Sequence, residues 1–499
     1  MRVRQPPRRS WASMPLLALL AIPASLAAQV APDPLTLEEA IALARENNPG
    51  YLSQASQIGA AEWGVRSAYA SLLPTLSTST GLGYTATGER RFDSVVLERQ
   101  PAQLSSRYNI GLNLTLNGST LLAPSVARAN ARAVEETADG AASTLEADVT
   151  QRYVTVLESL ATIEQAEREL ARTAEHVRLA QARFDVGAGT ALDVRRAEVQ
   201  RGQAEVRLVQ AQNAAANNLL LLSQTIGIRL PEGTQLEDSF ELFEPRWTAE
   251  ELVPLAIEEN PTLQASRAQA AAASTRARAA ASAYLPTISF NAGLSGYVSQ
   301  AETISPIVAQ QMRNAEQAYA GCVRDNEVYT RVGLPPRECL DPATPGFEDA
   351  LRSEIAAANR GFPFDWIRQP ASASLTISLP IFTGLTRQLQ VEEARIARLN
   401  AQYQVQAQQL QVQVEVETAL RNLQTAYRSA LLQQQIRETA EEELRLAEER
   451  FRFGATTSVE VVDAQASLAE AERAEIAALY EFHRSLAVLE SRIGRRLER

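Results

Sequence analysis

The sequence predicts a mainly helical chain in which two tandem copies of one pattern supply four long, paired helices and four β-strands. Three observations predict this fold class. Blocks of sequence recur in the same order in the two halves of the chain. Two very long segments contain almost no Gly or Pro, which favours unusually long helices. Four short segments alternate between apolar and polar residues, which is typical of β-strands.

The internal repeat organises the whole chain. Leu35–Pro49 matches Trp247–Pro261 at an offset of 212 residues. Further on, Arg183–Thr190 matches Arg450–Thr457 at an offset of 267 residues. Chance can give one such match, but several blocks in the same order indicate a duplication. We therefore predict a first repeat over residues 28–246 and a second over residues 247–499.

Each copy is expected to contain the same elements in the same order. Thr36 and Thr248 cap a short helix, an Asn-Pro pair interrupts it, and a longer Ala-rich helix follows. Two strands around a loop come next, and then a very long helix, a Gly turn and another long helix. The Gly turns, which form the tips of the two helical hairpins, are expected near residues 184–191 and 451–458.

The strands are expected near residues 75–85, 107–117, 287–297 and 372–382. Each is about ten residues long, which is the length of a tilted strand that crosses a bilayer. The same alternation fits a soluble sheet with one buried face, so both alternatives stay open. Because lipid excludes open sheet edges and four strands cannot close a barrel, a membrane location requires several chains in one barrel.

The composition excludes several classes of protein. The 499 residues carry a formal net charge of −11, which is opposite to the basic surface of a nucleic-acid-binding protein. Every basic residue is Arg, so lysine-dependent chemistry such as a phosphate-binding P-loop is excluded. Two His and two Cys leave little material for a metal site, and we predict no metal, no cofactor and no catalytic residues.

Residues 1–27 are expected to be a secretory signal peptide. Arg2, Arg4, Arg8 and Arg9 precede an apolar segment, and Ala27 ends a small-residue cleavage site. The apolar segment is shorter than the ~20 residues that a transmembrane helix needs. Export makes a disulfide between Cys322 and Cys339 our preferred pairing, in the long loop expected at residues 298–371. A metal-binding or redox pair is the less favoured alternative.

The export signal, the duplication, the paired strands and two Arg-Phe-x-x-Gly-x-x-Thr turns occur together. In this combination the chain resembles the TolC-type outer membrane efflux protein family, over residues 35–494. Ser374–Phe382, followed by Gly384 and a long helix, looks like that family's strand-to-helix junction. Leu116–Thr120 departs from the same pattern in the first copy.

The resemblance implies a homotrimer in the outer membrane. Its four strands per chain would form a 12-stranded barrel in the lipid, and its helices a periplasmic tunnel. The chain would be the passive exit duct of a tripartite efflux pump or a type I secretion system. Its partners would be a periplasmic adaptor (membrane fusion protein) and an inner-membrane pump of the RND or ABC type. The alternatives are a periplasmic coiled-coil scaffold without a channel and, less favoured, a secreted hydrolase.

The resemblance also assigns roles at the two turns. Carboxylates at Glu460 and Asp463 would ring the pore constriction. The family's polar lock at the tip would involve Asp193 and the positions of Phe451 and Thr456. Because Phe has no hydroxyl and Thr no cationic group, that form of lock is expected to be absent here, with Arg183, Arg450 or Arg452 as possible substitutes. The candidates for adaptor docking are Arg183, Gly187, Thr190, Arg450, Gly454 and Thr457.

Local chemistry gives several of these residues a second explanation. Thr190 with Asp193, and Thr457 with Glu460, have the spacing of a helix-capping box. Gly at a tight turn permits a positive φ. His176 and His483 lie in long helical segments and are expected to be helix-face residues, not ligands.

Overall fold

The computed structural model describes residues 34–93, 95–237 and 241–497. The predicted signal peptide, residues 1–27, lies outside the described residues. The chain divides into two compact units. Unit 1 comprises the N-terminal part up to Asn48 together with Leu145–Glu244 and Gln424–Ala487. Unit 2 comprises Pro49–Thr144, Pro245–Leu423 and Val488–Arg499. Each unit therefore takes segments from both predicted repeats, whose boundaries stay a prediction.

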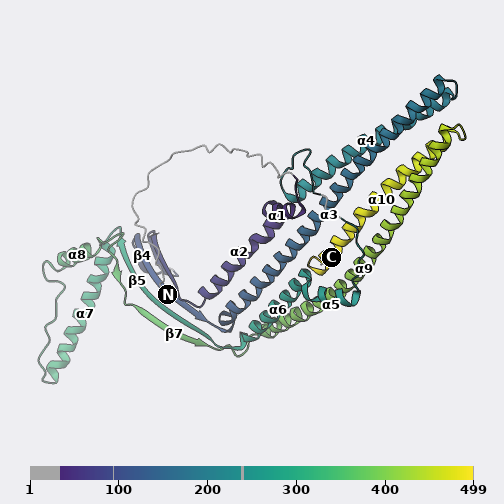
Figure 1. Ribbon diagram of the computed structural model, residues 1–499. Coiled ribbons are helices and arrows are strands. Elements are labelled where there is room, and N and C mark those ends of the chain that lie inside the picture. The colour runs from purple at the N-terminus through teal and green to yellow at the C-terminus, as the bar shows by residue number, and fades with distance from the viewer. Residues whose placement is uncertain (1–33, 94, 238–240, 498–499) are drawn as a thin grey trace, which may run out of the picture. The chain divides into compact units, whose positions relative to one another are not determined.

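Unit 2 contains an antiparallel sheet whose strands come from both halves of the chain. Its long strands are β1 (Thr75–Thr85), β4 (Gln103–Leu116), β5 (Thr287–Ala301) and β7 (Ser372–Ser378). The order is β1-β4-β5, and β5 pairs on its other side with β7 and with the short β6 (Ile367–Arg368). Figure 1 shows β4, β5 and β7 as a curved ribbon of adjacent strands.

The register of this sheet places apolar and polar residues on opposite faces. Leu76 of β1 lies opposite Leu112, which lies opposite Ala292 of β5, which lies opposite Ala373 of β7. The next row in each strand is polar or Gly: Ser77, Gly111, Gly293 and Ser372. Residues directly opposite each other on neighbouring strands point to the same face. The alternation that predicted the strands therefore continues in register across the sheet.

Two segments expected to be loops contain regular structure. β2 (Gly88–Phe92) and β3 (Val95–Gln100) form a hairpin between β1 and β4. The segment after β5 forms α7 (Ser305–Arg331) and α8 (Phe347–Ala358), and a disulfide joins Cys322 to Cys339. At the base of this helix pair, the Asn359 side chain bonds to the backbone N–H and C=O of Ala301 at 2.7 and 2.8 Å.

The fourth strand is shorter than expected. β7 ends at Ser378 instead of continuing to residue 382. Pro380 has no backbone N–H to donate to a neighbouring strand, so the ladder stops before it. Beyond Pro380, Ile381 and Phe382 are 96% and 77% exposed.

The helices of unit 2 include α2 (Pro49–Ala70), α5 (Ala249–Glu259) and α6 (Pro261–Ala281). In unit 1, α1 (Leu37–Asn47) begins at the capping box of Thr36 and Glu39. The four long helices are α3 (Gly118–Asp185), α4 (Ala191–Ile226), α9 (Thr386–Arg452) and α10 (Ser458–Ile493). None of the helices over the described residues combines the length and apolar composition that crossing a bilayer requires.

One junction occurs in both copies of the repeat. In unit 1, the Asn48 amide donates to the carbonyl of Thr225 at 2.8 Å, beside Gly227 with φ +90°. In unit 2, the Asn260 amide donates to the carbonyl of Arg492 at 2.8 Å, beside Gly494 with φ +99°. A side chain on either Gly would lie within 2.6 Å of a carbonyl of the short helix, so both positions require Gly.

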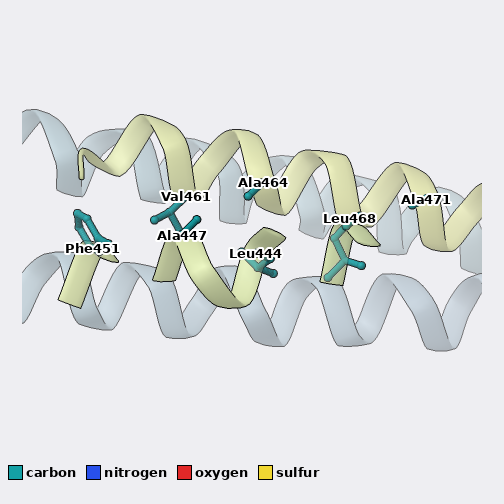
Figure 2. Packing of buried hydrophobic residues seen from close by; sticks show 8 residues of the cluster. Leu444, Ala447, Phe451, Val461, Ala464, Leu468 and Ala471 are labelled. Atoms are coloured by element: carbon teal, nitrogen blue, oxygen red, sulfur yellow. The ribbon is translucent and has the colours of Figure 1, made fainter. Parts of the chain in front are cut away.

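Two hairpins, α3–α4 and α9–α10, form much of unit 1 (Figure 1). In the second, the buried residues on α9 are spaced by three and four: Leu444, Ala447 and Phe451. On α10 they are Val461, Ala464, Leu468 and Ala471, which face α9 in Figure 2. This is the a/d pattern of a coiled coil, with Ala at alternate positions. The small Ala side chains allow the helices to pack closely.

Candidate functional site

The turns that close the two hairpins have the same backbone geometry. Gly187 and Gly454 both have φ +74°. The N–H of Ala188 donates to the carbonyl of Arg183 at 2.7 Å, and Ala455 donates to Arg450 at 2.8 Å. Each Gly N–H also bonds to the carbonyl three residues before it, at 3.0 Å. This pair of bonds is the Schellman motif, which ends a helix at a Gly with positive φ. The motif explains both Gly residues without any further role.

Asp193 links the first turn to the start of α10. Its backbone N–H donates to the Thr190 hydroxyl at 3.3 Å, and its carboxylate accepts from the Thr190 N–H at 3.0 Å. The other carboxylate oxygen accepts a hydrogen bond from the hydroxyl of Ser458. These bonds, the one from Ser458 first, hold the pKa of Asp193 below its ordinary value. Asp193 is therefore both the acid of the predicted capping box, whose N-cap is Thr190, and a bridge between the two turns.

Arg183 makes the second link between the turns. Its guanidinium donates to the backbone carbonyl of Phe451 and, at 3.2 Å, to that of Ala188. The guanidinium carbon also lies 4.3 Å from the centre of the Phe451 ring, which is a cation–π contact. Phe451 is only 5% exposed and belongs to the α9–α10 core. Arg183 thus uses a backbone carbonyl and an aromatic face, neither of which requires a tyrosine hydroxyl.

Thr456 does not take part in these links. Its hydroxyl oxygen is buried and has no hydrogen-bond partner among the described residues. The links that do occur include Ser458, which sequence reasoning missed. Ser458 lies two residues after Thr456 and follows Thr457, and nothing in a local pattern distinguishes which of these hydroxyls reaches Asp193.

Glu460 and Asp463 lie on one exposed face of α10, as their spacing of three predicts. The carboxylate of Glu460 lies 3.5 Å from the guanidinium of Arg450, at the end of α9. Both side chains are more than half exposed. Arg450 is proposed from the sequence only for adaptor docking or tip closure, and its pairing with Glu460 is seen only in the structure.

A groove of about 490 Å³ lies between the two turns within unit 1. Four of the six docking candidates line it, and they are Arg183, Gly187, Thr190 and Thr457. Arg450 and Gly454 do not line this groove, although Gly454 belongs to the second turn. Arg196, Asp193 and Ser458 also line the groove. Polar and apolar groups contribute about equally to its wall, and Phe451 is its aromatic part.

Both histidines are buried, which sequence reasoning did not predict. His176 on α3 is 5% exposed, and its ring centre lies 5.8 Å from that of Phe451. Its Nε2 has no hydrogen-bond partner among the described residues. His483 on α10 is 2% exposed and lies next to Phe482. Burial lowers the pKa of His176, and the nearby charge of Asp193 only partly offsets this.

The described residues contain no group of three or more His, Cys, Asp or Glu side chains placed to hold a metal ion. The predicted absence of metals and cofactors stays a prediction. Cys322 and Cys339 are joined to each other, as described above.

Solved structures share this fold over almost the entire chain. A membrane protein from Pseudomonas aeruginosa is 20% identical, with a TM-score of 0.67, and the match covers 92% of this chain and 90% of that one. The VceC outer membrane protein from Vibrio cholerae is 16% identical, with a TM-score of 0.67 and coverage of 93% and 97%. CusC, described for its transmembrane channel formation, is 16% identical, with a TM-score of 0.68 and coverage of 92% of each chain.

Comparison with protein-family models shows the family of this chain. The sequence model described as "Outer membrane efflux protein" matches residues 40–228 and 352–495. The segment between these matches includes all of α7 and the start of α8. The match confirms the resemblance drawn from the repeat and the two turns, together with the expected outer membrane location and transport role. This chain belongs to the outer membrane efflux protein family.

Proposed function

We propose that three copies of this chain form an outer membrane channel and a periplasmic tunnel that serve as the passive exit duct of an efflux or secretion system. The observation that carries this proposal is the sheet of unit 2. One face of the sheet carries most of the apolar side chains of the four long strands, and those on the edge strands β1 and β7 are exposed within the chain. Leu76, Leu82, Leu375 and Ile377 are each between 64% and 74% exposed.

Such a face fits lipid, while the opposite face fits water. The opposite face carries mostly Ser, Thr, Asn and Gly, for example Ser77, Asn109, Asn291 and Ser374. Alternation of lipid-facing and lumen-facing residues is the pattern of strands in an outer membrane barrel. The edge strands β1 and β7 have unpaired backbone groups, which lipid does not tolerate. Pairing of these edges between three copies closes a 12-stranded barrel.

Exposed heptads on the helices support association between copies. On α4, in unit 1, the residues at seven-residue spacing are Leu192, Val199 and Val206, each more than half exposed. On α9, in unit 2, they are Leu389, Ile396, Tyr403 and Leu410, with exposures from 48% to 65%. A heptad stripe is the seam of a coiled coil, so it requires a partner helix. We assign these stripes to helices of neighbouring copies in a helical tunnel.

The hairpin turns would form the closed tip of the tunnel. Closure in this chain would depend on Asp193 with Ser458 and on Arg183 with Phe451, in place of the lock described for the family. Glu460 and Asp463 would ring the constriction, where carboxylates attract cations and repel anions. A periplasmic adaptor would dock on the turns, at the six positions predicted for docking, and an inner-membrane RND or ABC pump would supply the driving force.

Photo-crosslinking in cells tests this proposal. A photoreactive residue is placed at Ala188 or Ala455, inside the two turns, and captured proteins are identified by mass spectrometry. We expect a periplasmic adaptor to be captured and the protein to need detergent for extraction. Self-crosslinks alone would contradict the docking role. Recovery from the soluble periplasm without an adaptor would instead favour the coiled-coil scaffold.

A further inference from the structure

The pair Arg450 and Glu460 differs from its counterpart in the other copy of the repeat. The offset of 267 residues relates Arg183 to Arg450 and Asp193 to Glu460. In the first copy the two side chains reach separately across to the second hairpin, Arg183 to Phe451 and Asp193 to Ser458. In the second copy the two side chains face each other, with 3.5 Å between Arg450 Nη1 and Glu460 Oε2. The duplicated pair has therefore taken two different arrangements.

Asp463 has no such neighbour. It lies three residues after Glu460 on the same exposed face of α10. The described part of the chain supplies no ion pair to its carboxylate. Of the two acids that the family resemblance places at the constriction, one faces a guanidinium and the other has no ion-pair partner among the described residues.

We propose that Arg450 is a selectivity-determining residue that offsets the charge of Glu460, so that Asp463 carries most of the cation preference of the channel. This inference rests on the proposed role of Glu460 and Asp463 as the constriction. An opposite charge at 3.5 Å turns the field of a carboxylate into that of a dipole, which weakens faster with distance than the field of a single charge. Each chain then contributes one effective negative charge to the ring instead of two.

The exposure of the pair makes this role separable from folding. The side chains of Arg450 and Glu460 are 61% and 53% exposed, and exposed ion pairs contribute little to stability. Neither residue belongs to the buried cluster between α9 and α10. Replacing Arg450 by Gln therefore changes the local charge while the hairpin stays folded. Any effect on permeation then reports the electrostatic field.

The test is the reversal potential of the purified full-length protein in a planar lipid bilayer under a KCl gradient. R450Q is expected to raise the K⁺/Cl⁻ permeability ratio about twofold to fivefold, the range for one unit charge a few ångströms from an ion in water. D463N is expected to lower the ratio more than E460Q does. In the R450Q background, E460Q is expected to gain an effect as large as that of D463N.

R445Q is the matched control, because Arg445 is also an exposed Arg on α9 but is paired with Glu442 and Glu449. R445Q is expected to leave the ratio unchanged. Equal effects of E460Q and D463N, with no effect of R450Q, would overturn this inference but would still support the role of Glu460 and Asp463 at the constriction. No effect of any of the three variants would overturn the constriction itself. A widened tip is distinguished because it raises conductance without shifting the reversal potential.

Discussion

Arg172 on α3 and Glu472 on α10 form a two-pronged ion pair that joins the two hairpins of unit 1. Nη1 lies 3.0 Å from Oε1, and Nη2 lies 2.6 Å from Oε2. The amide of Gln165 donates to the same carboxylate at 3.0 Å. The side chains of Arg172 and Glu472 are only 27% and 13% exposed, so water screens the pair less than it screens a surface ion pair. The two hairpins are therefore fixed to each other well away from their turns.

Removing one partner of this pair is expected to destabilise unit 1. R172Q leaves the Glu472 carboxylate with the Gln165 amide as its remaining hydrogen-bond partner among the described residues, and we expect a loss of about 1–3 kcal/mol in the free energy of unfolding. A double-mutant cycle with E472Q, measured by thermal unfolding in detergent, isolates the coupling between the two side chains. R168Q is the control, since Arg168 is exposed and lies 3.9 Å from Glu164 on the same helix. Additive effects of R172Q and E472Q would show that the pair is not coupled.

The burial of His176 predicts a loss of stability in mild acid. Burial lowers the pKa of His176 below its ordinary value of 6.5, so the folded protein favours the neutral ring. This contribution is complete above pH 6.5 and is lost as the pH falls through the lowered pKa. The protection of backbone amides near residues 176 and 451 against hydrogen exchange, corrected for the intrinsic exchange rate at each pH, is therefore expected to fall as the pH drops below 6.5.

H176F keeps an aromatic ring beside Phe451 and removes the titration. We expect the hydrogen-exchange protection of H176F to lose this pH dependence. His176 lines a second groove in unit 1, whose charged side chains are Arg168, Arg172 and Glu175 on α3, Arg437, Glu441, Arg445, Glu448 and Arg452 on α9, and Glu472 and Glu475 on α10. The charge of Asp193 on α4 also acts on His176. An unchanged pH dependence in H176F would assign the effect to one of these groups instead.

Gly187 in the first turn and Gly202 inside α4 are expected to respond in opposite ways to substitution by Ala. Gly187 has φ +74°, where a Cβ atom costs roughly 1–2 kcal/mol, so G187A is expected to lower the melting temperature. Gly202 lies inside α4 with open space around its Cα, so G202A is expected to raise stability by up to about 1 kcal/mol. Both changes in stability are measured from circular dichroism melting curves. Equal shifts for the two variants would refute the positive-φ explanation of Gly187.

Two adjacent residues of β7 test which face of the sheet meets lipid. Leu375 lies opposite Phe290 on the apolar face, whereas Ser374 lies opposite Asn291 on the polar face. L375R is expected to reduce assembly in the outer membrane, because Arg on a lipid-facing strand costs about 2–4 kcal/mol near the bilayer centre. S374R, which adds the same charge one position away, is expected to assemble. The measurement is the amount of protein in the outer membrane fraction. If L375R assembled and S374R did not, the face that contains Ser374 would be the one that meets lipid.

Much of the fold followed from local patterns. The expected four long helices and four strands are confirmed. Apolar residues recur every second residue in strands and every 3.6 residues in helices, and Gly residues indicate the turns, so the sequence predicts these elements. The helices α7 and α8 were missed within the segment expected to be a loop. A signal was present in α7, since Val308, Met312, Ala315 and Tyr319 follow helical spacing and are partly or fully buried. The Pro residues that flank this segment obscured it.

The candidate site was predicted in its parts and not in its pairings. The capping box of Thr190 and Asp193 is local, so three residues of spacing are enough to predict it. The bond from Ser458 to Asp193 joins residues 265 positions apart, and no local pattern fixes such a distance. The burial of His176 beside Phe451 likewise depends on how the two hairpins pack.

The sequence by itself determined the duplication, the strands with one apolar and one polar face, the long helices and the two Gly turns. Each of these depends on periodicity or on backbone conformation over a few residues. Only the tertiary structure decided that Arg183 reaches across to Phe451 while its counterpart Arg450 faces Glu460. The partner of a long, flexible side chain depends on which distant segments of the chain pack beside it, so equivalent positions in a repeat can acquire different partners.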